Sequence, residues 1–229
     1  NDIGLGNLFA ECFKGTHRFC VDNQKWYIYN HGIWEVDKGD IKAQGNMQRL
    51  LQMLDIYCDE IAADTDPEIL KSYRAYINKS SSDTILRRAL NASKNSLVIN
   101  LTDFDSDPYL LNCRNGVYDL REQKFRFAKP EDYLTLTVNC NFPTAINIHK
   151  CDRWYSFVDE ITEGGKEKAA FLQRALGYSL LGVNREECMF LAYGRTRSGK
   201  GTLFNSIAKI LGMGTDNGYG GSVNSSLVC

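Results

Sequence analysis

The chain has 229 residues, of which 43% are hydrophobic and 24% are charged, and its formal net charge is -1 at pH 7. This composition is typical of a globular protein with one large or two small domains, and the charge gives no general attraction to nucleic acid. No apolar run approaches the roughly 18 residues of a membrane helix, and no signal-peptide pattern opens the chain. We therefore expect a cytoplasmic protein with no membrane contact.

The cysteines and acidic residues give little support for a metal site. The eight cysteines never form a CxxC pair, which favours reduced thiols in a chain without a secretory signal. The best zinc candidate combines Cys140, His149 and Cys151, but its spacing is irregular and a fourth ligand is missing. Three aspartates stand at alternate positions, namely Asp103, Asp105 and Asp107. They lack the glycine and the distal glutamate of a calcium loop, so we predict a solvated turn and no metal site.

The first hundred residues predict an α+β module of short antiparallel strands and a helical bundle. Apolar spacing predicts an amphipathic helix over residues 2–13, and three aromatic and β-branched runs predict an antiparallel meander within residues 17–36. Trp26 and Trp34 in this meander could stack on bases. Few basic residues alternate with them, so the aromatic core of a small sheet is the favoured interpretation.

Three helices are predicted after the meander. Residues 44–63 carry apolar side chains at three- and four-residue steps, as in an amphipathic helix. Asp66 and Pro67 start a second helix, with proline at its first position, and residues 81–83 cap a third, which together predict a small bundle. Three basic residues accompany the third helix, namely Arg87, Arg88 and Lys94. They could meet phosphate, although a solvated helix face is the favoured interpretation.

A β-hairpin is predicted in the middle of the chain. Residues 109–120 hold an Asn115-Gly116 pair between apolar runs, which is the strongest short signal for a hairpin. Further strand candidates are residues 97–101, 123–127 and 133–138.

A domain boundary is expected in residues 139–150, which contain a proline and have no clear period. The boundary separates a domain at 1–150 from a domain at 151–229. After it, residues 152–161 and 166–181 predict two helices. The expected buried face of the second is Phe171, Leu172, Leu176 and Leu180.

The order strand, phosphate loop and helix is predicted next. An apolar run, 188–193, ends in a glycine, and a Gly-Lys pair then opens a helical pattern at 202–211. Glycines let the backbone wrap an anion, so that N–H groups and the positive helix end point at phosphates while the lysine reaches the outer ones. We predict a nucleoside triphosphate site with Lys200 as its catalytic lysine. The binding residues are Gly194, Arg197, Ser198, Gly199, Lys200, Gly201 and Thr202.

The loop departs from the usual pattern directly after the lysine. Gly201 stands where Ser or Thr would hold magnesium, and Thr202 comes one place late, where it would bond an inner phosphate. ATP with Mg²⁺ is the expected cofactor, with the ion held mainly by water and by acids elsewhere. Hydrolysis needs a carboxylate on a second strand, but the sole acidic residue after Thr202 is Asp216. We expect weak nucleotide binding, no turnover by this chain alone, and a longer parent protein. Residues 217–229 are Gly- and Ser-rich, and we assign no helix or strand to them.

Several segments resemble the phage and plasmid primase-helicases, relatives of the poxvirus-type nucleoside triphosphatase within helicase superfamily three. Residues 171–182 and 193–204 resemble the entry to that family's helicase domain. Residues 111–120 are similar to the Asn-Gly hairpin of its middle domain, and residues 26–37 to its entry strands. Residues 2–9 resemble a loose form of its opening Asp-x-Gly-Asn signature.

The resemblance implies a replication protein in the cytoplasm of a bacterial host. Its AAA+-like motor, a hexameric ring in the parent protein, would move along single-stranded or forked DNA using ATP. It also implies a helical collar at 153–183, followed by the first strand, loop and helix of an α/β P-loop domain. One departure is Ser198, because family members usually have Asn before the Gly-Lys pair. The remaining motor residues and any primase site would lie outside this sequence.

Two other functions remain open from the sequence. The Gly-Lys-Gly-Thr ending also resembles the loop of adenylate-kinase-type small-molecule kinases, although there the loop opens the chain and here it stands at residue 194. A non-catalytic interaction module is the third interpretation, in which residues 1–150 dock a partner or assemble a ring and the loop is vestigial. Binding of single-stranded DNA and ATP hydrolysis by an extended chain would separate a helicase from both.

Overall fold

The computed structural model describes residues 1–143 and 151–222. They form two compact units, a first unit of Asn1–Phe104 and a second unit that begins at Asp105. The boundary expected near residue 150 does not coincide with this division, and His149 of the zinc candidate lies outside the described residues. Within the described residues, no helix has the length and hydropathy of a membrane span.

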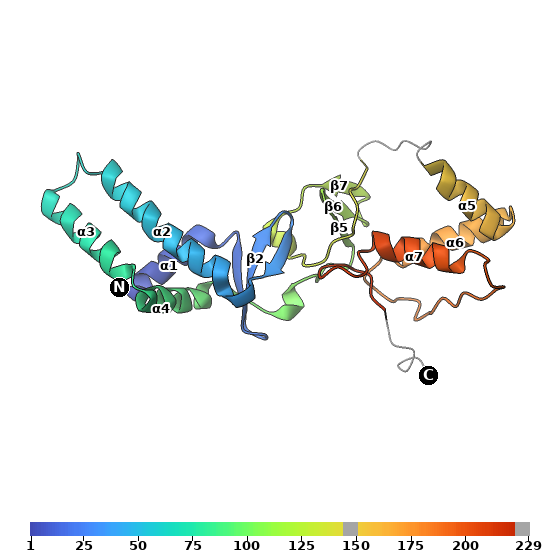
Figure 1. The fold of residues 1–229 in the computed structure, drawn as a ribbon, viewed down its shortest axis with the longest axis horizontal. Coiled ribbons are helices and arrows are strands. Elements are labelled where there is room, and N and C mark those ends of the chain that lie inside the picture. The colour runs from blue at the N-terminus through green and yellow to red at the C-terminus, as the bar shows by residue number, and fades with distance from the viewer. Residues whose placement is uncertain (144–150, 223–229) are drawn as a thin grey trace. The chain divides into compact units, whose positions relative to one another are not determined.

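Four helices belong to the first unit (Figure 1). α1 (Asp2–Phe13) matches the predicted helix, and the side chain of Asn1 caps it by accepting a hydrogen bond from Gly4 N at 2.8 Å. The three predicted bundle helices are α2 (Ile41–Glu60), α3 (Pro67–Ser80) and α4 (Asp83–Ser93). Asp66 caps α3 by accepting from Glu68 N at 2.8 Å, as the Asp-Pro start predicts.

The sheet of the first unit has the strand order β3-β2-β1-β4. β1 (His17–Cys20), β2 (Lys25–Asn30) and β3 (Ile33–Val36) pair antiparallel, so the predicted meander is confirmed. β4 (Val98–Ile99) is the short core of the strand predicted at 97–101, and it pairs parallel to β1. Because the whole helical bundle separates β1 from β4 in the sequence, the local pattern gave no indication of this pairing.

One apolar core joins this sheet to the four helices. Trp26 and Trp34 are 0% and 1% exposed, so the core interpretation of both tryptophans is confirmed. Phe9 and Phe19 meet the ring of Trp26 edge-on, at centroid distances of 6.3 and 5.4 Å. Other members come from each helix, and among them are Leu5, Met47, Leu51, Ile77, Leu86 and Leu90.

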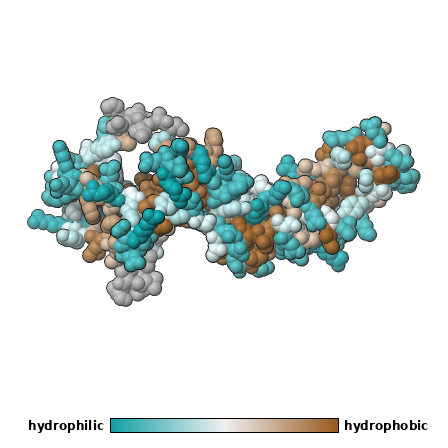
Figure 2. Space-filling model, turned by 180° about the vertical axis from the view of Figure 1, so that it is seen from behind, coloured by the Kyte–Doolittle hydropathy of each residue, from teal (hydrophilic) through white to brown (hydrophobic). Residues whose placement is uncertain are grey.

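An open apolar groove of about 290 Å³ remains between α1, α2 and α3. Its lining includes Leu5, Leu8, Leu54, Tyr57, Tyr73 and Ile77. Figure 2 shows hydrophobic residues gathered among hydrophilic ones at the surface of this helical end. These helices therefore bury one apolar face in the core and keep a second apolar strip at the surface.

The second unit contains a three-stranded antiparallel sheet of order β5-β6-β7. β5 (Leu110–Cys113) and β6 (Gly116–Asp119) form the predicted hairpin, and β7 (Lys124–Arg126) confirms the next strand. Gly116 has a φ of +149°, and a Cβ there would lie 2.5 Å from Arg126 O, so only glycine fits. Short 3-10 helices occupy Lys38–Asp40, Lys94–Ser96 and Leu101–Asp103 in the first unit and Pro130–Asp132 in the second.

The strand predicted at residues 133–138 is wrong. The segment forms no β-ladder, because its backbone amides donate to separate parts of the unit. Thr137 N donates to Asn217 O at 2.7 Å, and Val138 N donates to Asn112 O at 2.8 Å. Leu134 and Val138 are nevertheless buried. The segment therefore buries two apolar side chains and joins other segments by hydrogen bonds without pairing as a strand.

The described residues of the second unit after residue 150 form three helices (Figure 1). α5 (Asp152–Thr162), α6 (Lys166–Tyr178) and α7 (Lys200–Ile210) confirm the predicted helices, although α6 ends before the expected residue 181. The buried face predicted for α6 is wrong, because no residue of α6 is buried and Phe171 is 57% exposed.

The strand predicted at residues 188–193 is also wrong. These residues form no ladder, and Met189, Leu191 and Tyr193 are 75%, 79% and 91% exposed. A buried strand exists only through pairing with its neighbours, and the described residues supply no neighbour here. The described residues therefore contain the loop and its helix without a parallel sheet around them.

Candidate functional site

The loop predicted to bind phosphate leads directly into α7. Lys200 is the first residue of α7, and Gly199 before it has a φ of +84°. Gly194 and Arg197 also have positive φ, at +151° and +65°. These turns fold the loop back on itself, and at two of the three positions glycine makes the turn without steric cost.

The ammonium group of Lys200 lies inside this loop. Its Nζ donates to Gly194 O at 2.9 Å, to Arg195 O at 2.8 Å and to Ser198 Oγ at 3.0 Å. An ammonium group has three N–H donors, so the loop oxygens satisfy all of them. Phosphate oxygens are stronger partners for a cation than these neutral acceptors, so an entering phosphate would replace them. Lys200 is therefore the charge around which the loop is arranged.

Gly199 is also required by packing against α5. A Cβ on Gly199 would lie 2.6 Å from Ile161 Cγ2 and 3.3 Å from Phe157 Cε2. Both side chains belong to α5, so this helix lies directly against the loop. A larger residue at position 199 would strain the backbone and displace α5.

The other predicted binding residues lie on the same loop and the first turn of α7. Arg197, Ser198, Gly201 and Thr202 are all exposed and therefore accessible to a ligand. A Cβ on Gly201 would meet no atom within 4 Å, so space does not require glycine there. The unpaired N–H groups of the first turn of α7 give this end of the helix a partial positive charge.

These donors suit phosphate better than a metal ion. The loop offers backbone N–H groups, an ammonium group and the hydroxyls of Ser198 and Thr202, whereas Gly201 has no side chain to offer. In the described part of the chain, no group of three or more His, Cys, Asp or Glu side chains could hold a metal ion. A magnesium ion here would need its oxygen ligands from phosphate and water.

Two of the three alternate aspartates order a local turn, and Asp105 between them binds a distant segment. Asp103 accepts from Asn100 N at 2.8 Å and Asp107 from Tyr109 N at 3.0 Å. Asp105 accepts from Thr135 N at 2.8 Å. Their carboxylates are therefore used by the backbone around them.

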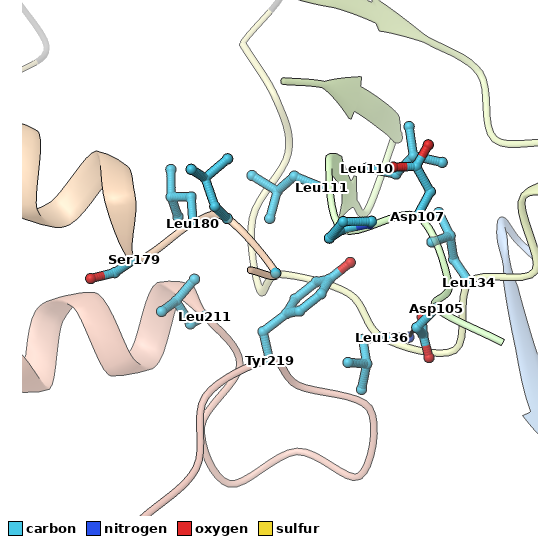
Figure 3. A pocket seen from close by; sticks show the side chains of 13 residues that line it. Asp105, Asp107, Leu110, Leu111, Leu134, Leu136, Ser179, Leu180, Leu211 and Tyr219 are labelled. Atoms are coloured by element: carbon cyan, nitrogen blue, oxygen red, sulfur yellow. Dashed lines mark hydrogen bonds between the residues drawn. The ribbon is translucent and has the colours of Figure 1, made fainter. Parts of the chain in front are cut away.

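A cavity of about 290 Å³ lies in the second unit, between aliphatic side chains and Tyr219 (Figure 3). Asn112 N donates to the Tyr219 hydroxyl at 3.1 Å. Burial raises the pKa of Tyr219 to about 12, so the hydroxyl stays protonated at neutral pH. The labelled leucines are Leu110, Leu111, Leu134, Leu136, Leu180 and Leu211. Asp105 and Asp107 also line the cavity, and both carboxylates already accept hydrogen bonds from backbone N–H groups.

Residues 217–222 form no helix or strand, which fits the expectation for this stretch, but Tyr219 among them has a defined contact. Residues 217–222 are described, and Tyr219 is held at the cavity, while residues 223–229 lie outside the described part. Sequence reasoning also missed Phe157 and Ile161, which cover Gly199. The signal available for Tyr219 was its position as the one aromatic residue in a glycine-rich stretch.

Comparison with known proteins gives two findings. A protein of Acanthamoeba polyphaga mimivirus named "Putative helicase L207/L206" is 27% identical over 236 residues, covering 91% of this chain and 23% of that protein. The chain thus spans about a quarter of the length of this curated relative. The family described as D5 N terminal like matches residues 6–163, which is more than half of the chain and ends before the loop. The chain therefore belongs to the D5 N terminal like family.

Proposed function

We propose that the chain is the nucleotide-binding front of an ATP-driven DNA helicase that acts in replication. The observation that carries the proposal is the position of Lys200, whose ammonium group lies within a glycine-turned loop at the start of α7. The name of the mimivirus relative supports the helicase part of the proposal.

In this proposal the loop binds the phosphates of ATP. Lys200 exchanges its three loop oxygens for outer phosphate oxygens, and the backbone N–H groups of residues 197–202 surround the phosphates. Thr202 donates its hydroxyl to an inner phosphate. Mg²⁺ arrives with ATP and lowers the charge of the phosphates, with water completing its ligands.

The proposed partner of the parent protein is single-stranded or forked DNA, and the proposed assembly is a hexameric ring. A net charge of -1 gives this chain no general attraction to DNA, so the contacts must be local or lie in other parts of the parent. Hydrolysis also needs a carboxylate that positions the attacking water. We therefore expect this chain to bind ATP without turnover.

Calorimetric titration of the chain with ATP and Mg²⁺ tests the site. Lys200→Ala should weaken ATP binding at least tenfold, or about 1.4 kcal/mol, because the phosphates lose the cationic partner that the loop surrounds. Lys209→Ala is the matched control, because it removes the same charge from the last turn of the same helix. Its affinity for ATP should equal that of the wild type.

Two outcomes would contradict the proposal. Equal affinities of the wild type and both lysine variants would show that the loop does not hold the phosphates. Phosphoryl transfer to a nucleoside monophosphate by the parent protein, without binding of single-stranded DNA, would favour a small-molecule kinase.

A further inference from the structure

A groove of about 590 Å³ runs between α5 and α7, next to the loop. α5 contributes Arg153, Trp154, Phe157 and Glu160 to its lining, and α7 contributes Thr202 and Ser206. Pockets for small ligands commonly have volumes of about 300–1,000 Å³, so the groove has room for a base and a sugar.

The groove begins where the loop ends. Phe157 both lines the groove and lies against Gly199, and Thr202 lies in the first turn of the helix that Lys200 opens. A nucleotide with its outer phosphates at Lys200 would have its inner phosphate toward Thr202. The sugar and base attached to that phosphate then continue past Thr202 toward Ser206, along the groove.

The chemistry of the lining suits a nucleoside. Trp154 and Phe157 form an aromatic pair with a centroid distance of 5.8 Å and an interplanar angle of 42°. Base rings stack on such side chains irrespective of base identity, and larger rings gain more contact. Arg153 and Glu160 supply donors and acceptors at the rim, and the hydroxyl of Ser206 can bond a ribose hydroxyl.

We propose that the α5–α7 groove holds the base and ribose of a purine nucleoside triphosphate, with Trp154 as the stacking side chain. This inference rests on the proposed function, because it assumes that the phosphates bind at Lys200. It assigns to α5, the helix that lies against the loop at Gly199, the discrimination between purine and pyrimidine nucleotides.

Titration with ATP, CTP and inorganic tripolyphosphate distinguishes the contribution of the groove to binding from that of the phosphate loop. Wild-type chain should bind ATP more tightly than CTP and tripolyphosphate. Trp154→Ala should weaken ATP binding about 5- to 100-fold and leave tripolyphosphate binding unchanged, because only the base is stacked. Trp154→Phe should retain part of the affinity for ATP. Tyr155→Ala is the matched control, because Tyr155 is the next residue of α5 and lines the pocket between α5 and α6, whereas Trp154 lines both that pocket and the groove.

Tryptophan fluorescence gives a second readout. Trp26 and Trp34 are 0% and 1% exposed and belong to the first unit, so quenching by ATP reports on Trp154. Quenching by ATP but not by tripolyphosphate is expected. Equal binding of ATP and tripolyphosphate, unchanged in Trp154→Ala, would overturn the groove while leaving the phosphate site intact. Absence of binding by all three ligands would overturn the phosphate site and the groove with it.

Discussion

In the first unit, α1 to α4 and the sheet enclose a continuous apolar core, in which Phe9, Trp26 and Met47 are fully buried. In the second unit, the described residues from 151 onward include just three buried ones, namely Thr162, Leu203 and Gly212. Phe171 and Phe204 lie at the surface of its helices. Amphipathic spacing therefore predicted helices in both units, but it predicted burial correctly only where the described chain supplies a second face.

Hydrogen bonds join segments of the second unit that are distant in the sequence. Asn139 N donates to Ile210 O at 2.7 Å, and Gly182 N donates to Pro108 O at 2.9 Å. Each such bond contributes about 1 kcal/mol net, but losing one partner of a buried pair costs more. Removing an apolar side chain should therefore lower the free energy of unfolding of the first unit more than that of the second. Removing a side chain that accepts or donates hydrogen bonds should lower the stability of the second unit more than that of the first.

The largest expected effect is that of Trp26→Ala. Removing this fully buried side chain leaves a cavity and should lower the free energy of unfolding by about 3–5 kcal/mol. Phe171→Ala in the second unit should cost less than about 1 kcal/mol, because the ring is 57% exposed. Denaturant unfolding followed by circular dichroism measures both.

Trp26→Phe is a sharper control for the core. Trp26 Nε1 is buried and has no hydrogen-bond partner among the described residues, so phenylalanine removes an unsatisfied donor as well as some volume. It should destabilise the first unit much less than alanine does. Equal losses of stability in Trp26→Ala and Phe171→Ala would contradict the difference in core packing between the two units.

Local sequence patterns correctly predicted the elements whose geometry depends on residues adjacent in the sequence. The Asp66-Pro67 start, the hairpin and the glycine before Lys200 each depend on a few adjacent residues, and all three are present. Their turn and cap geometry is set by backbone sterics, which a short motif reports directly. The two turn residues of the hairpin are Arg114 and Asn115, one position before the predicted Asn-Gly pair, because Gly116 already pairs with Cys113.

The wrong predictions concern segments whose hydrogen-bonding or packing partners lie far away in the chain. Residues 133–138 have the alternation of a strand, but their amides bond to residues as distant as Asn217. Residues 188–193 have the composition of a buried strand but no described neighbour to pair with. The groove beside the loop combines Trp154 with Ser206, and no motif links positions so far apart.

A pH titration should distinguish the two units. His17 is 1% exposed, its Nε2 accepts from Asn46 Nδ2 at 3.0 Å, and its Nδ1 lies 2.9 Å from Thr16 Oγ1. Burial lowers the pKa of His17 from 6.5 to about 4, although nearby Asp37 acts in the opposite direction. Between these values the unfolded histidine binds a proton that the folded one does not. The first unit should therefore keep its full stability above pH 6.5 and lose at most about 3 kcal/mol as the pH falls toward 4.

His17→Gln isolates this contribution. The variant is expected to be less stable at neutral pH, but its stability should fall less as the pH is lowered, since its side chain does not titrate. No histidine lies among the described residues of the second unit, so fluorescence of Trp154 should report no matching change there. Parallel stability curves for the wild type and His17→Gln would show that His17 is not the titrating group.

Asp105→Ala should give the smallest of these effects and the one most specific to the second unit. The Asp105 carboxylate accepts from Thr135 N at 2.8 Å and Leu136 N at 3.4 Å, and also from the Thr135 hydroxyl. Alanine leaves these part-buried donors without their charged acceptor, which should cost about 2 kcal/mol in denaturant unfolding followed through Trp154. Asp83→Ala in the first unit removes an exposed pair with Arg87 and should cost well under 1 kcal/mol. If the two aspartate variants lose equal stability, polar bonds do not hold the second unit more than the first.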